Sequence, residues 1–188
     1  MIVGKKVTLL PLDEIHLETV RSWINNPEVR AGTGTEGPVS SYEHRRWYEK
    51  LMCNDRRRAF IIGEHSEGIV SPVGLTGFND VDVRARRAEL WIYIGQTDAR
   101  RKGLASEATL LLLRHAFDML GLHRVELRVM ESNARAISLY RKLGFVEEGV
   151  ARESLFHGGC FHNMLLFSML ESEFRGLPGE LERCARRS

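Results

Sequence analysis

Three cations, a glycine and a small residue lie together in the stretch RRKGLA, residues 100–105. A run typical of a strand, AELWIYIG, precedes it, and a run typical of a long helix, SEATLLLLRHAFDMLG, follows it. The first N–H groups of a helix have no partner within the helix and lie at the positive end of its dipole, so they attract phosphate. Gly103 and Ala105 would let a diphosphate approach the backbone closely. The junction therefore predicts a phosphate site or, more simply, a turn whose cations lie in solvent.

Other groups at this junction could contact a diphosphate through charge or hydrogen bonds, namely Arg100, Arg101, Lys102 and the hydroxyl of Ser106. Two other phosphate-binding motifs do not occur: GxxxxGK[ST] is missing, and no GxGxxG follows the first predicted strand. We therefore exclude nucleotide hydrolysis and dinucleotide redox chemistry.

The composition is that of an ordinary globular protein, with 188 residues of which 43% are hydrophobic and 28% charged. This length suits a single domain, which we place at residues 1–170, followed by a polar, Arg-rich tail at 171–188. The 27 Lys and Arg against 25 Asp and Glu leave a net charge of +2, so we do not expect a nucleic-acid partner. No stretch suits a signal peptide or a membrane span, and we expect a soluble, cytoplasmic protein.

Several clusters of reactive or charged residues favour ordinary structural roles. The cysteines are odd in number and form no CxxC pair, which predicts free thiols at Cys53, Cys160 and Cys184. The stretch HGGCFH offers only three ligands at a spacing that matches no standard zinc site, so we expect no metal. The basic runs DRRRAF (55–60) and RARRA (84–88) are interpreted as solvated faces.

The hydrophobic pattern predicts a mixed α/β domain. Strands are expected at 6–12, 58–64, 73–80, 87–95 and 123–130, with a terminal hairpin over 146–170, and helices at 13–26, 41–52, 103–121 and 133–145. A loop is expected at 31–40. Short turns between 58 and 95 favour antiparallel pairing, whereas strand, helix, strand after residue 87 favours a parallel pair. The result would be a mostly antiparallel sheet of about six or seven strands with helices on both faces.

Three motifs between Glu89 and Phe145 resemble those of the GNAT superfamily of acyl-CoA-dependent N-acetyltransferases. In that family, [QR]xxGx[GA] stands between a central strand and a helix, and is followed by a strand, an Asn and a helix ending in Tyr-x-x-x-Gly-Phe. This sequence has RRKGLASEA, VELRVMESN and AISLYRKLGF in that order. More loosely, residues 5–170 are similar to the branch that holds the ribosomal-protein N-terminal acetyltransferases and the bacterial spermidine N-acetyltransferases.

The resemblance implies that acetyl-CoA is the cosubstrate and that the central sheet opens into a V near Ile94. The diphosphate would lie on residues 100–106, and the pantetheine arm would lie along the preceding strand. The implied binding residues are Ile92, Tyr93, Ile94, Arg100, Arg101, Lys102, Gly103, Leu104, Ala105, Ser106, Asn133 and Tyr140.

Two side chains are candidates for proton transfer. Tyr140 matches the family position whose hydroxyl points at the thioester sulfur, where it could protonate the leaving thiolate, although its helical spacing also suits a core position. Glu89 opens the strand beside the reacting carbonyl and could accept the proton of the amine, or it could simply pair with Arg86 or Arg87. A backbone N–H at Ile94 or a neighbour would polarise the carbonyl.

The implied reaction is direct acetyl transfer to a primary amine in a ternary complex, the acceptor being a protein N-terminus or a small molecule. Arg128 and Ala136 replace a Glu base and a serine found in some ribosomal-protein enzymes, whereas NARAISLY and RRAEL match the spermidine enzymes. A polyamine acceptor is therefore the first alternative. A non-catalytic acyl-CoA-binding sensor module is an alternative of another class, and a homodimer is expected by analogy alone.

Overall fold

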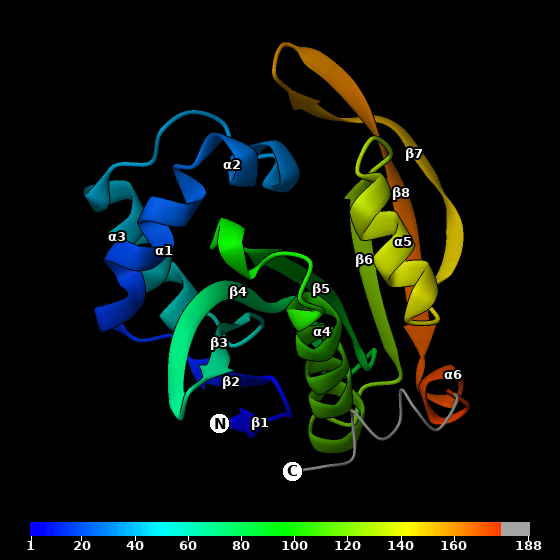
Figure 1. Cartoon of the computed structure of the whole chain (residues 1–188). Coiled ribbons are helices and arrows are strands. Elements are labelled where there is room, and N and C mark those ends of the chain that lie inside the picture. The colour runs from blue at the N-terminus through cyan, green and yellow to red at the C-terminus, as the bar shows by residue number, and fades with distance from the viewer. Residues whose placement is uncertain (178–188) are drawn as a thin grey trace.

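A single mixed sheet forms the centre of the protein, seen in a computed structural model that describes residues 1–177. Within that range the sheet has eight strands in the order β1-β2-β3-β4-β5-β6-β8-β7, one or two more than the sequence predicts (Figure 1). The strands are β1 (Ile2–Val3), β2 (Val7–Pro11), β3 (Arg58–Ser66), β4 (Ile69–Asp82), β5 (Arg87–Ile94), β6 (Arg124–Met130), β7 (Val146–His157) and β8 (Cys160–Leu170). The additional pairing comes from the two-residue β1, which is too short to leave a periodic signal.

All strand pairs are antiparallel except β5 with β6, as the order of strands and helices predicts. The helices are α1 (Leu17–Ile24), α2 (Pro27–Thr33), α3 (Ser41–Met52), α4 (Leu104–Arg114), α5 (Ala134–Lys142) and α6 (Glu171–Arg175). One turn of π-helix, His115–Met119, extends α4. No helix among the described residues combines the length and apolar character that crossing a membrane requires.

Helices cover both faces of the sheet, as predicted. The larger core lies between the sheet and α4 and α5, with Leu111, Leu112 and Phe167 almost completely buried. The smaller core lies on the opposite face, where α1 and α3 contribute Trp23 and Leu51. Residues 89, 91 and 93 of β5 face α1 and α3, because side chains alternate along a strand and Ala88 and Leu90 belong to the α4 core. Glu89 is thus on the face away from α4.

β5 and β6 separate soon after they pair. Their ladder consists of Arg87 with Arg124, Ala88 with Val125, and Glu89 with Glu126. β5 then continues to Ile94 without a strand partner on that edge, and Figure 1 shows β6 leading away with α5. The V expected near Ile94 therefore begins earlier, just after Glu89. It divides the molecule into an N-terminal arm (β1 to β5 with α1 to α4) and a C-terminal arm (β6 to β8 with α5 and α6).

Two segments differ from the predicted elements. Residues 27–33 form helix α2, because Pro27 suits the first helical turn and the Asn26 side chain accepts a hydrogen bond from the Glu28 N–H. The expected loop at 31–40 therefore begins later. The folded domain also passes residue 170, where we placed its end, since α6 buries Phe174 against Phe117 at 5.2 Å between ring centroids. The rest of the expected tail, 178–188 with Cys184, lies outside the described residues.

Candidate active site

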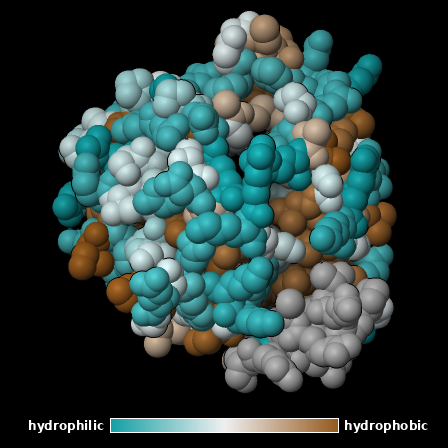
Figure 2. Space-filling view, in the orientation of Figure 1, coloured by the Kyte–Doolittle hydropathy of each residue, from teal (hydrophilic) through white to brown (hydrophobic). Residues whose placement is uncertain are grey.

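Two cavities open on opposite sides of the V. One, of about 510 Å³, lies against α1, α2 and α3, and the other, of about 500 Å³, lies against the start of α4 and α5. Both are lined by residues at the point where the arms separate, namely Gly32, Ile92, Tyr93, Met130, Asn133, Ala136 and Tyr140. Figure 2 shows a hollow between the arms with a hydrophobic floor and hydrophilic borders. Two molecules, one in each cavity, would therefore come into contact at this junction.

The cavity beside α4 has the backbone of a phosphate site. Gly103 is the N-cap of α4 with φ +84° and has no side chain to cap the helix, so the first N–H groups have no partner within the helix itself. Buried Glu107 fixes this helix start by accepting the backbone N–H of Lys6 at 2.8 Å and that of Lys5. Gly103, Leu104, Ala105 and Ser106 all line the cavity. The predicted glycine loop thus presents a helix N-terminus, which favours anions, to this cavity.

The three predicted cations of this loop have different environments. Arg101 lines the cavity without an ion-pair partner among the described residues. Arg100 also lines it, but its guanidinium binds Glu28 of α2 at 2.7 Å. Lys102 turns away and binds Glu64 of β3 at 2.9 Å, so the structure does not bring it into the cavity. The sequence could not show this, because Glu64 is distant along the chain.

One further cation lines the same cavity. Arg135, in the first turn of α5, faces the α4 start from the C-terminal arm and has no ion-pair partner within residues 1–177. Its position two residues after Asn133 in the family motif was the available signal. Arg101 and Arg135 together place unpaired positive charge on both sides of the cavity.

The free edge of β5 connects the phosphate site with the junction. Ile92, Tyr93 and Ile94 line the cavity beside α4, and no strand within residues 1–177 pairs with this edge after Glu89. The strand ends at Ile94, and the N–H of the next residue, Gly95, donates to the Val73 carbonyl at 2.9 Å. An extended chain with amide groups would find unpaired backbone donors and acceptors here.

Tyr140 lies at the junction of the two cavities. The residue is 6% exposed, and its ring packs against Phe145 and Phe167 at 5.7 and 6.3 Å between centroids. Its hydroxyl has no hydrogen-bond partner among the described residues. Burial raises the pKa of Tyr140 to about 12, so the phenol stays protonated at neutral pH. Asn133 lies nearby, where its side chain accepts from the Ala136 N–H at 3.1 Å and caps α5.

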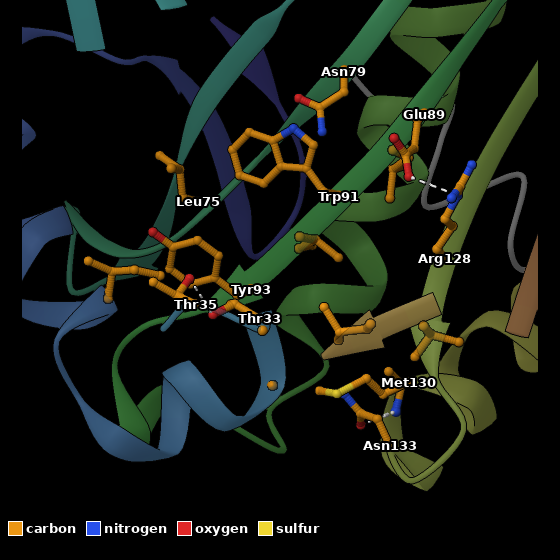
Figure 3. Close-up of a pocket in the computed structure, with 18 of the residues that line it drawn as sticks. Thr33, Thr35, Leu75, Asn79, Glu89, Trp91, Tyr93, Arg128, Met130 and Asn133 are labelled. Carbon is orange, nitrogen blue, oxygen red and sulfur yellow. Dashed lines mark hydrogen bonds and ion pairs between the residues drawn. The ribbon is translucent and has the colours of Figure 1, made fainter. Parts of the chain in front are cut away.

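Glu89 lines the cavity on the α1 and α3 side, at the start of the V. Its carboxylate pairs with Arg128 of β6 at 3.7 Å, and not with Arg86 or Arg87, which bind Glu171 and Glu126 (Figure 3). Desolvation raises the pKa of Glu89, while the charge of Arg128 opposes the rise. A half-buried carboxylate of this kind is suited to accept a proton.

Aromatic side chains form the wall of the Glu89 cavity. Trp91 and Tyr93 follow Glu89 on the same face of β5, with ring centroids 6.5 Å apart, and His44 and Trp47 of α3 are stacked at 5.0 Å. Burial lowers the pKa of His44, so this imidazole is neutral at physiological pH. Of these rings, only Tyr93 was predicted as a site residue, on the strand implied to bind the pantetheine arm.

The sequence around these two cavities matches a known protein family. Residues 6–146 match the acetyltransferase (GNAT) domain. The chain belongs to the GNAT acetyltransferases. This confirms the resemblance inferred from the three motifs, and the V between β5 and β6 is consistent with it.

Two curated GNAT relatives cover most of the chain. Spermidine N(1)-acetyltransferase of Escherichia coli is 29% identical over 89% of this chain and 88% of its own. YdaF, a Bacillus subtilis protein that bears the name of a ribosomal N-acetyltransferase, is 26% identical over 93% of this chain and 96% of its own. These relatives match the suspected branch of the family.

The solved structures that resemble the chain include a GNAT enzyme with bound CoA. Spermidine N-acetyltransferase from Vibrio cholerae, in complex with CoA and spermine, has a TM-score of 0.83 at 26% identity and covers 91% of this chain and 99% of that one. A dodecameric structure of the Vibrio cholerae enzyme has a TM-score of 0.78 at 26% identity and covers 91% and 97%. The protein is accordingly an acetyl-CoA-dependent N-acetyltransferase that acts on an amine.

Proposed function

We propose that acetyl-CoA fills the cavity beside α4 and that the amine enters through the Glu89 cavity. The unpaired N–H groups at the α4 start, with Arg101 and Arg135, suit the diphosphate and the further phosphate of CoA. The free edge of β5 from Ile92 to Ile94 suits the pantetheine amides as an added strand. The main support for this proposal is that Tyr140 lines both cavities.

In this arrangement, the amine nitrogen attacks the thioester carbonyl carbon directly. A C–N bond forms, the C–S bond breaks, and the electron pair leaves with sulfur. Tyr140, protonated at neutral pH, donates its proton to the departing thiolate. Glu89 takes the proton that the amine loses, through water, and an N–H of the free β5 edge near Tyr93 stabilises the oxyanion.

The acceptor is a primary amine on a small molecule or at a protein N-terminus. The structural match to an enzyme in complex with CoA and spermine supports a polyamine as one candidate acceptor. Nothing in this arrangement needs a covalent enzyme intermediate, since both substrates reach the junction at once. A non-catalytic sensor module would keep the glycine loop but would have no use for the Tyr140 hydroxyl.

We also propose that the protein forms a homo-oligomer, with a homodimer as the smallest unit. The dodecameric state of the Vibrio cholerae structure supports self-association. Light scattering coupled to gel filtration would test it, and a mass equal to one chain at micromolar concentration would contradict it.

Initial rates of CoA release test the proposed function. The purified protein is assayed at varied acetyl-CoA and varied amine, with polyamines, amino carboxylic acids, aminoglycosides and peptides with free N-termini. Double-reciprocal plots that intersect are expected, because both substrates bind before transfer. Parallel lines, which indicate a covalent acetyl-enzyme, would contradict direct attack. Tight acetyl-CoA binding without turnover on any amine would favour the sensor module.

A further inference from the structure

The wall of the Glu89 cavity nearest β3 carries hydrogen-bond donors that have no acceptor among the described residues. We call Arg57, Asn79 and Trp91 the donor cluster. The Arg57 Nε donates to the Asn79 Oδ1 at 3.0 Å, and its other nitrogens bind no described residue. The indole Nε1 of Trp91 is buried and has no acceptor in the part of the chain that the structure describes. Figure 3 shows this nitrogen on the ring edge nearest Asn79. Buried donors of this kind are rare unless a ligand or water completes them.

Strand register builds the donor cluster. Asn79 of β4 lies opposite Glu89 of β5, and Arg57 immediately precedes β3, next to the pair formed by Arg58 and Phe78. A turn in which the Arg57 N–H donates to the Asn54 carbonyl at 3.1 Å holds this residue at the cavity wall. The expected solvated run at 55–60 is therefore wrong for Arg57, which is half-buried while Arg56 and Arg58 are exposed.

The neighbouring strand β4 leaves room for the indole ring of Trp91. Gly77 is its partner on β4, and a Cβ on that glycine would come within 2.8 Å of the indole ring. The absence of a side chain at Gly77 thus leaves room for the indole, and Trp91, Tyr93 and Leu75 form an apolar surface between the cluster and the junction.

The charges on the cavity wall do not balance. Its charged residues within the described range are Arg57, Arg128 and Glu89, and Glu89 is already paired with Arg128. His44, the remaining titratable group with a nitrogen, is neutral because burial and Arg21 lower its pKa. Arg57 therefore contributes a positive charge that no side chain of the cavity neutralises.

We propose that the amine acceptor carries a carboxylate, which binds the donor cluster while the amine lies at the Tyr140 junction. This inference rests on the proposed function and names the class of its acceptor. A carboxylate accepts from both the free guanidinium nitrogens and the indole N–H, and arginine is the side chain best suited to hold it. Two strand spacings, ~10 Å, separate β3 from β5, and this sets the length scale on which we place the carboxylate from the amine.

A polyamine meets the opposite situation in this cavity. Its distal ammonium has only donors to offer, so the Trp91 N–H and Arg57 would both stay without an acceptor. It would also approach the unpaired charge of Arg57, and like charges repel. The donor cluster therefore selects against a second cation at this distance from the reacting amine.

Three matched substrate series test the proposal. The first series is aminohexanoate, aminooctanoate and aminodecanoate, each with its amine at the end of the chain. The second is the alkylamines of equal chain length, and the third is the terminal diamines of equal chain length. C-terminally amidated tripeptides with a free N-terminus and either Glu or Lys at the third position show whether a peptide side chain can supply the same carboxylate. Each is assayed for kcat/KM with the wild-type protein, Arg57→Gln, Arg57→Glu and the exposed neighbour Arg56→Gln. Acetyl-CoA binding by each variant shows that it is folded.

The expected result is a kcat/KM about tenfold or more above the matched alkylamine and diamine for at least one amino acid or for the Glu tripeptide. Arg57→Gln should remove this preference and Arg57→Glu should shift it toward the diamine, while Arg56→Gln should keep it. Faster acetylation of diamines by the wild type, or an equal loss on all series in Arg57→Gln, would overturn the inference and leave the acetyltransferase function intact. Failure to acetylate any amine would overturn the proposed function as well.

Discussion

At the scale of single residues, the ion pair between Glu89 and Arg128 sets the charge state of the proposed base. Arg128 favours the carboxylate form, whereas desolvation favours the protonated form and raises the pKa. The base works only when deprotonated, so activity falls as the pH drops through the pKa of Glu89. The acid limb of the pH–rate profile therefore reports this group.

We predict that Arg128→Gln moves the acid limb of kcat/KM to higher pH. Removing the cation removes the influence that lowers the pKa of Glu89, so a higher pH is needed to deprotonate it. The measurement is kcat/KM across the acid range with one acceptor. Glu89→Gln is the matched control, which should abolish this limb. An unchanged acid limb in both variants would place the base elsewhere.

At the scale of elements, the surroundings of the α4 start distinguish cations that line the proposed CoA cavity from one that points away from it. Arg101→Gln and Arg135→Gln should each raise the Kd of acetyl-CoA about tenfold, because each removes one charge-assisted contact with phosphate. Lys102→Gln should leave it unchanged, since this ammonium binds Glu64. Calorimetric titration measures all three. A higher Kd for Lys102→Gln alone would contradict this assignment, because it would mean that the loop rearranges around the ligand.

The end of β5 depends on a glycine for packing. A Cβ on Gly95 would lie 2.2 Å from the ring of Trp23, a buried residue of α1. We expect Gly95→Ala to lower the free energy of unfolding by about 2 kcal/mol through overpacking. Gly149→Ala, where a Cβ would meet nothing within 4 Å, should change it by less than about 0.5 kcal/mol. Urea denaturation of both variants checks this, and equal stabilities would contradict the packing argument.

At the scale of the whole molecule, local patterns predicted the parts of the site that lie within single elements. The loop pattern predicted Gly103, whereas Tyr140 was predicted from the family resemblance and Glu89 from its place at the start of the strand beside the expected V. Arg57 and the direction of Lys102 could not be found, because they depend on which strands lie side by side. The same holds for the eighth strand and for the docking of α6, which are decided by long-range packing.

The central claim is that two cavities, one for acetyl-CoA and one for the amine, meet at Tyr140 between the arms. The most direct test is to measure kcat and the Kd of acetyl-CoA for Tyr140→Phe beside the wild type. We expect the Kd to stay the same, because the ring and its contacts with Phe145 and Phe167 are kept, while kcat falls about 100-fold with the loss of the proton donor. A folded variant that binds acetyl-CoA and retains full turnover would contradict the claim.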